Sequence, residues 1–136
     1  MKRSKIRCPH CGAQAVLRPS SVVYHERARP GEHLYVCARY PQCDSYVSAH
    51  KSTLLPMGTL ANAPLRRKRI LAHRSFNRLW EEGPMKKWQA YQWMQAKLAL
   101  PSDQAHIAMM SEYMCDQLIA ACDLAVSNMK HMKRAA

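Results

Sequence analysis

Four cysteines in two closely spaced pairs constrain this chain more than any other feature. Cys8 and Cys11 have C-x2-C spacing, and Cys37 and Cys43 have C-x5-C spacing after twenty-five intervening residues. Each pair can supply two thiolates from one tight turn, and two such turns facing each other form a closed tetrahedral site for zinc. We therefore predict one zinc ion bound by these four cysteines. A closed four-sulfur site has no open position for water, so we expect this zinc to be structural.

The residues around the cysteine pairs predict a small antiparallel sheet. β-like runs cover residues 15–18, 21–25, 33–37 and 45–48, and Pro30-Gly31 indicates a turn within residues 27–32. This pattern is typical of a zinc ribbon, whose core is too small to fold without its metal. Three cysteines and one histidine are an alternative ligand set, because histidines also lie nearby, but four cysteines at these spacings leave no vacancy. These histidines are His10, His25, His33 and His50.

The second cysteine pair carries a family resemblance. Its segment Cys37-Ala-Arg-Tyr-Pro-Gln-Cys43-Asp resembles the C-terminal zinc ribbons of bacterial type IA topoisomerases, which have the same C-x5-C spacing around an aromatic-Pro pair. That resemblance covers about forty residues, with a longer loop between the pairs here, and it implies binding of single-stranded DNA.

The whole chain also resembles a small zinc-finger-containing family of unknown activity from phage and prophage genomes. The matching segments are Cys8-Pro-His-Cys-Gly, Tyr35 to Val47, Pro56-Met-Gly-Thr-Leu-Ala-Asn, Leu65-Arg-Arg, Ala72-His73 and Phe76 to Trp80. This resemblance spans roughly residues 8–125 and implies the architecture more than the function.

The charge balance points to a polyanionic partner. Twenty-one Lys and Arg against nine Asp and Glu give a net charge of +12, and residues 51–100 carry ten basic and only two acidic side chains. Such a field attracts DNA or RNA, although solubility or an acidic protein partner would also account for it.

The sequence predicts a soluble cytoplasmic protein without a membrane partner. Its basic start is not followed by an apolar run, and nowhere do eighteen apolar residues occur in succession. Thiols stay reduced in the cytoplasm, which favours metal binding over disulfides.

We expect an α+β chain with a zinc ribbon over residues 1–50 and an ordered connector over 51–64. A helical domain of three or four helices follows over 65–129, with a frayed tail over 130–136. Helices are predicted over about 65–82, 85–98 and 111–129, with a short helix or turn ending at Met110. In the second of these, we expect Trp88, Tyr91 and Leu98 in the core. Trp93 lies on the side of Lys86 and Lys97. It is either buried between helices, which is slightly favoured, or exposed to contact a base or a protein partner.

The first predicted helix has a basic face. Arg67, Arg74 and Arg78 share the side opposite the apolar residues, and no acidic residue occurs between Lys51 and Trp80 to balance them. This imbalance favours phosphate contacts over a merely solvated face. Three more basic residues extend the face at its N-terminal end: Arg66, Lys68 and Arg69.

Tyrosines and arginines on or beside the predicted sheet suggest a second nucleic-acid contact. Aromatic rings beside basic groups form stacking platforms for unpaired bases. The alternative is that the tyrosines pack a thin core with their hydroxyls in water. The residues concerned are Tyr24, Tyr35, Tyr40 and Tyr46, with Arg18 and Arg39.

The leading hypothesis is therefore a non-enzymatic, zinc-dependent nucleic-acid-binding accessory protein, with single-stranded or irregular DNA favoured over RNA. The alternative is a phage-type interaction or inhibitor module that binds a host enzyme, for which nine methionines suit an adaptable interface. A metal-dependent nuclease is disfavoured, because the nine acidic residues form no motif with metal-ligand spacing.

Overall fold

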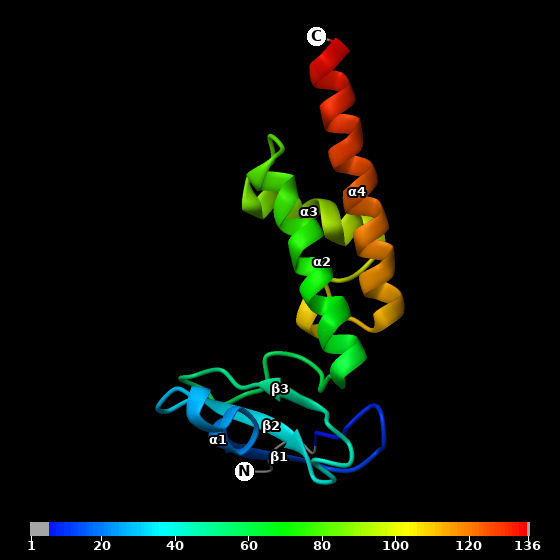
Figure 1. Ribbon diagram of the computed structural model, residues 1–136. Coiled ribbons are helices and arrows are strands. Elements are labelled where there is room, and N and C mark those ends of the chain that lie inside the picture. Colours follow the sequence, from blue (N-terminus) through cyan, green and yellow to red (C-terminus); the bar gives the residue numbers. More distant parts are fainter. Residues whose placement is uncertain (1–5, 136) are drawn as a thin grey trace. The chain divides into compact units, whose positions relative to one another are not determined.

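The computed structural model describes residues 6–135 (Figure 1). The chain forms two compact units that divide between Pro64 and Leu65, and each unit is described by itself. The first five residues of the predicted ribbon and the last residue of the predicted tail lie outside the described range. None of the helices within that range is long and apolar enough to cross a membrane.

The N-terminal unit is built on a three-stranded antiparallel sheet. Strands β1 (Ala15–Pro19), β2 (His33–Cys37) and β3 (Tyr46–Ser48) lie in the order β1-β2-β3, with β2 in the centre. The register pairs Leu17 with Tyr35, and Tyr35 with Val47. The predicted runs at 15–18, 33–37 and 45–48 therefore correspond to the strands of this sheet.

The run at 21–25 is not a strand, and that expectation was wrong. Residues Ser21–Tyr24 form a single helical turn, α1, followed by a 3₁₀ turn, η1, over His25–Arg27. The carbonyl oxygen of Ser20 accepts hydrogen bonds from the amides of Val23 at 3.0 Å and Tyr24 at 2.8 Å. This helical turn outweighs the β propensity of the two adjacent valines, because tertiary packing commonly overrides local preference.

Both faces of the sheet have packing partners. On one face, Ala15, Cys37 and Val47 belong to a buried cluster around the cysteines. On the other face, Leu34 and Val36 are buried, and Tyr24 from α1 meets Tyr46 edge-on at 5.9 Å between ring centroids. Residues beyond β3 also contribute: Leu60 is fully buried in the cluster around the cysteines, and Ala61 and Tyr46 exchange backbone hydrogen bonds. The segment predicted as a connector is thus ordered, although Leu55 stays 56% exposed.

The helical unit contains three α-helices and a short 3₁₀ turn. They are α2 (Ala63–Glu81, whose first two residues precede the unit boundary), α3 (Lys87–Leu98), η2 (Ile107–Met109) and α4 (Glu112–Ala135). α4 continues to Ala135, six residues past the predicted end at Met129. The buried side chains come from all four elements and include Phe76, Leu79, Met94, Leu118 and Cys122.

The core of α3 differs from the predicted one. Trp88 is 58% exposed, so its placement in the core was wrong, and the fully buried residues of this helix are Ala90 and Met94. Tyr91 and Leu98 are half-buried, and Tyr91 packs edge-on against Phe76 at 5.0 Å. Trp93 is half-buried as well.

Gly83 permits close packing at the turn between α2 and α3. A Cβ atom at this position would lie 2.6 Å from the carbonyl oxygen of Leu79 and 2.6 Å from the Met129 sulfur. The missing side chain therefore lets α4 pack against the end of α2, which accounts for the glycine.

Candidate metal centre and basic surfaces

The first cysteine pair lies on a tight turn that precedes β1. The amide of Gly12 donates to the carbonyl of Cys8 at 2.9 Å, and the amide of Cys8 donates to the carbonyl of Ala13 at 2.8 Å. Gly12 has a φ of +79°, the left-handed conformation that glycine adopts without steric cost. The amides of His10 and Cys11 also donate to the Cys8 sulfur. The sequence Cys-Pro-His-Cys-Gly thus folds into a loop that points two sulfurs the same way.

The second pair begins where β2 ends. The amide of Tyr40 donates to the carbonyl of Cys37 at 2.9 Å, and that of Cys43 donates to the carbonyl of Arg39 at 3.1 Å. The amide of Arg39 donates to the Cys37 sulfur, as those of His10 and Cys11 do to Cys8. The first cysteine of each pair is therefore positioned by backbone amides as well as by its turn.

The two turns bring all four sulfurs together. The sulfurs of Cys8, Cys11, Cys37 and Cys43 lie within 4.8 Å of one another, with Cys8 and Cys43 at 3.6 Å and Cys11 and Cys37 at 3.3 Å. A tetrahedral zinc site with bonds of about 2.3 Å has sulfurs about 3.8 Å apart. A disulfide requires about 2.05 Å, and all four cysteines are free thiols. The cluster therefore has the composition and geometry to hold one zinc ion.

The electrostatics of the cluster also favour a bound cation. Burial raises the pKa of Cys37 to about 12, whereas burial of Cys8 is outweighed by hydrogen bonds that lower its pKa to about 7. Four thiolates this close together repel one another strongly, so they cannot all ionise without a positive charge between them. A divalent metal deprotonates coordinating thiols and removes this conflict.

Ser45 is a supporting residue that was not predicted. Its side chain is fully buried, its hydroxyl lies 3.3 Å from the Cys43 sulfur, and it also hydrogen-bonds to Cys8. Groups that hydrogen-bond to metal ligands orient them and tune their basicity. The sequence shows only that Ser45 lies two residues after the last cysteine. That position alone does not distinguish a buried, hydrogen-bonded serine from an exposed one.

No histidine joins the metal cluster among residues 6–135. The ring of His10 instead lies 3.2 Å from the side-chain amide of Asn62, and the ring of His33 forms a hydrogen bond with the carbonyl of Gly31. The described ligand set is the four cysteines.

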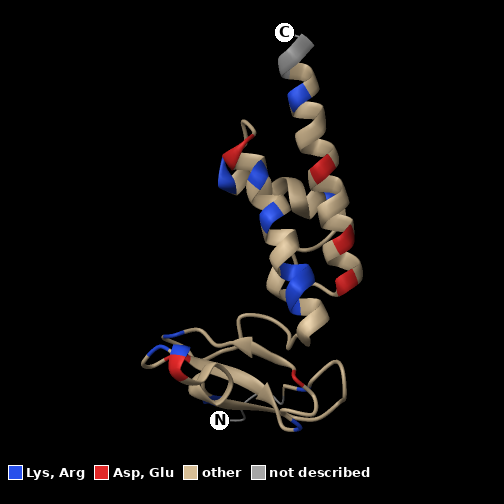
Figure 2. Cartoon of the chain, viewed as in Figure 1, with Lys and Arg blue, Asp and Glu red and all other residues tan. Residues whose placement is uncertain are grey.

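Several of the six basic residues predicted on α2 have interaction partners of their own. Lys68 pairs with Asp116 of α4 at 2.6 Å. Arg78 pairs with Glu82 at 2.7 Å and with Asp123 of α4 at 3.5 Å. Figure 2 shows acidic positions on α4 as well as the basic positions on α2. No acidic residue occurs within residues 52–80, but acidic partners from later in the chain balance two of the basic residues of this helix.

Arg69 is buried, with 8% of its surface exposed. Its Nε and Nη2 atoms donate to the carbonyl of Met110 at 3.1 and 2.9 Å. Among the remaining basic residues of α2, Arg67 and Arg74 are exposed and Arg66 is half-buried with an interaction of its own. The basic face that is left for a partner is centred on Arg67 and Arg74.

Three of the four tyrosines considered for base stacking have packing roles. Tyr24 packs edge-on against Tyr46 on one face of the sheet, and Tyr35 packs beside the cysteine cluster while its hydroxyl donates to the carbonyl of Leu54 at 2.6 Å. Tyr40 is half-buried within the second cysteine turn, next to the exposed Arg39.

Comparison with known proteins agrees with this description. The profile of one family, described as a zinc-finger-containing domain, matches residues 4–135. No curated protein and no solved structure matches the chain. Because the match covers nearly the whole sequence, and the four-cysteine cluster lies within it, the chain belongs to this zinc-finger-containing domain family.

Proposed function

We propose that this protein is a non-enzymatic nucleic-acid-binding accessory protein whose N-terminal unit depends on zinc, and that it binds single-stranded or irregular DNA. The observation that carries the proposal is the pair of exposed arginines on α2, Arg67 and Arg74. They are seven residues apart, on one helical face, and neither is paired with any side chain in residues 6–135. A net charge of +12 supports attraction to a polyanion.

In this proposal the N-terminal unit contacts nucleic acid through Arg39 and Tyr40 only, a smaller surface than the tyrosine platform predicted from the sequence. Arg39 and Tyr40 lie together in the second cysteine turn, where a guanidinium and a ring suit a phosphate and a base. The resemblance of this turn to topoisomerase zinc ribbons supports single-stranded DNA as the partner. A closed four-sulfur zinc site supports a binding role, because it offers no open coordination position. The absence of a disulfide among the six cysteines suits action in the reducing cytoplasm.

Replacing Arg67 and Arg74 together with glutamate is expected to weaken binding to a single-stranded oligonucleotide at least tenfold at low salt. Each lost phosphate contact should also lower the slope of log K against log salt by about 0.7. Fluorescence anisotropy with a labelled twelve-residue oligonucleotide, repeated at several salt concentrations, measures both quantities.

The matched control has the same change in net charge at exposed positions elsewhere. Lys51→Glu with Lys97→Glu alters one exposed residue in each unit, and neither residue belongs to α2. We expect this control to bind more tightly than the arginine variant. Equal losses in the two variants would show that total charge, and not this helical face, determines binding.

A second candidate function rests on two apolar residues of the same helix. Ile70 and Leu71 are 52% and 46% exposed, and with Arg67 and Arg74 they occupy positions i, i+3, i+4 and i+7. Such a stripe suits a protein partner, which would make the chain an interaction or inhibitor module. In that case Ile70→Gln with Leu71→Gln should abolish capture of one partner from nuclease-treated lysate while leaving oligonucleotide affinity unchanged. If nuclease removes all captured material, the protein-partner function is wrong.

A further inference from the structure

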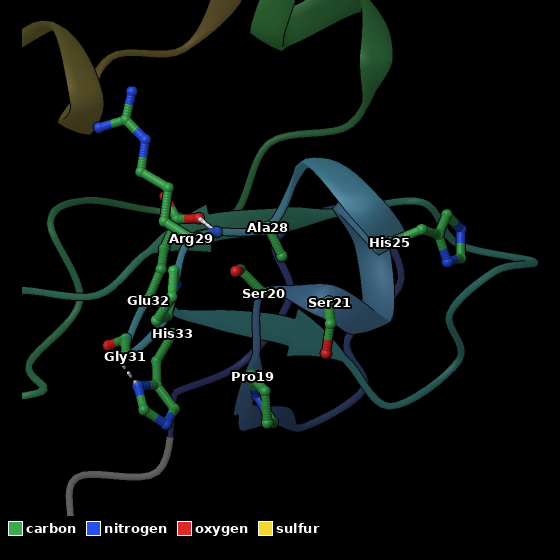
Figure 3. Close-up of a pocket in the computed structure, with 10 residues that line it drawn as sticks. Pro19, Ser20, Ser21, His25, Ala28, Arg29, Gly31, Glu32 and His33 are labelled. Atoms are coloured by element: carbon green, nitrogen blue, oxygen red, sulfur yellow. Dashed lines mark hydrogen bonds between the residues drawn. The ribbon is translucent and has the colours of Figure 1, made fainter.

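The segment inserted between β1 and β2 forms a pocket that the metal centre does not use. This cavity of about 360 Å³ lies between the end of β1, α1, η1 and the turn that leads into β2 (Figure 3). Its volume is within the range of small-molecule sites. It lies entirely within the N-terminal unit.

A buried hydroxyl without a partner lies on the wall of this pocket. Ser20 is 1% exposed, and its Oγ atom has no hydrogen-bond partner in residues 6–135. In Figure 3 this oxygen points into the space near Ala28 and Glu32, while the ring of His25 points away. Buried polar atoms are nearly always hydrogen-bonded, so this hydroxyl is suited to meet a ligand atom.

The lining also contains the Glu32 carboxylate and the His33 ring. The Glu32 carboxylate accepts a hydrogen bond from the amide of Arg29 at 3.3 Å, which fixes it at the turn. The ring of His33 lies 3.1 Å from the carbonyl of Gly31 through Nδ1. Because a carbonyl only accepts, Nδ1 is the donor in this contact. In Figure 3 the side chain of Arg29 extends away from Ser20, so its guanidinium is assigned no contact in the pocket.

This combination fits a nucleobase better than a phosphate. A carboxylate in the lining repels an anion but accepts hydrogen bonds from a neutral ring. Pro19 and Pro30 add apolar surface against which a flat ring can lie. Enzymes that read a base outside the stack use the same means, namely hydrogen bonds to its edge and apolar contact with its faces.

We infer that this pocket binds one unpaired base, and that the base is guanine. Guanine presents two adjacent donors, N1–H and N2–H, which suit the Glu32 carboxylate, and beside them an acceptor, O6, which suits the Ser20 hydroxyl. This inference rests on the proposed function, because the base would belong to the bound strand. It adds a preference for strands that contain guanine.

The direct test uses free nucleotides and the full-length zinc-loaded protein. Guanosine 5′-monophosphate, adenosine 5′-monophosphate and inorganic phosphate are titrated separately while amide signals are followed by NMR. Only the guanine nucleotide is expected to shift the amides of Ser20, Gly31 and His33 in a saturable way. Equal shifts with all three ligands would identify an anion site and overturn the inference, as would no shift with any of them.

Two variants test the assigned contacts. Ser20→Ala and Glu32→Gln are each expected to weaken binding of the guanine nucleotide about fivefold to tenfold, as expected for a lost hydrogen bond. Ser52→Ala, at an exposed position of the same unit, is the control and should bind as the unaltered protein does. Zinc content and thermal unfolding show that each variant is folded. Unchanged affinity in folded Ser20→Ala would mean that the hydroxyl does not contact the base, and would overturn the assignment.

A second measurement separates this inference from the proposed function. Affinities are compared for an oligothymidylate of twelve residues and the same strand with one central guanine. Tighter binding of the guanine strand, lost in Glu32→Gln, supports the pocket. Strong but equal binding of both strands supports the proposed function and overturns the pocket. Saturable nucleotide binding with no binding of either strand supports the pocket and overturns the proposed function.

Discussion

Removing the zinc, or replacing Cys37 with serine, is expected to unfold the N-terminal unit and leave the helical unit folded. Cys8 and Cys37 are two of the five buried residues in the cluster around the metal site, so the ligands are also the core. A core of this size supplies about 3–5 kcal/mol at most, whereas zinc contributes about 10–16 kcal/mol in comparable fingers. The helical unit has its own buried core and should be unaffected.

Counting reactive thiols measures this outcome for each unit separately. After a strong chelator is added at pH 8, four of the six cysteines are expected to react with a thiol reagent. Cys115 and Cys122 should stay protected, because both are fully buried and burial raises the pKa of each, to about 12 for Cys122. All six should react in guanidinium chloride, and a zinc-sensitive dye should report one metal ion released per chain.

The control for this experiment is Cys115→Ala. It should retain one zinc ion per chain and still expose four thiols to the reagent after chelation, because the changed cysteine lies in the helical unit. Six reactive thiols after chelation alone would show that the helical unit cannot remain folded by itself. No change on chelation would show that the four cysteines do not hold a metal.

The zinc site was predictable because its geometry is local. Each pair of cysteines is fixed by a turn of a few residues, and the Gly12 turn and the short runs of β1 and β2 are visible in the residue pattern. Once two such turns are linked by antiparallel strands, their sulfurs meet without further information from the rest of the chain. The same reasoning does not extend to Ser45, whose role appears only when the sheet brings it beside Cys8.

The errors arose where partners come from distant parts of the chain. Two valines in the run at 21–25 favour a strand locally, but the segment packs Tyr24 against Tyr46 and becomes a helical turn. Trp88 is one of two tryptophans in α3, yet it is exposed and the fully buried residues of the helix are Ala90 and Met94. Residue size and hydrophobicity did not indicate which side of α3 faces its neighbours.

The basic face of α2 was overestimated for the same reason. Asp116 is forty-eight residues from Lys68, so no local pattern could reveal that they pair. The pocket beside Ser20 was equally invisible, because its walls come from both ends of a folded insertion. Only the three-dimensional structure therefore distinguishes the exposed arginines of α2 from those that are buried or paired.

Arg69→Met is expected to destabilise the helical unit by about 2–3 kcal/mol, the cost of leaving a buried acceptor without its donors. Nε and Nη2 of Arg69 donate to the carbonyl of Met110, directly before the turn where α4 begins. The methionine keeps most of the buried apolar volume but supplies no donor. For a unit of this size the loss corresponds to about 8–20 °C in the unfolding temperature, measured by circular dichroism at 222 nm.

Arg67→Met, two residues earlier on the exposed side of the same helix, is the matched control for that variant. It removes the same charge and the same guanidinium, but we expect its stability to change by less than about 0.5 kcal/mol. Oligonucleotide affinity should respond in the opposite order, because Arg67 belongs to the proposed contact face and Arg69 does not. Equal unfolding temperatures for the two variants would show that the buried guanidinium contributes nothing to stability. Affinities are measured well below both unfolding temperatures. If Arg67→Met and Arg69→Met then lose equal oligonucleotide affinity, exposure does not determine which arginine of this helix contacts the oligonucleotide.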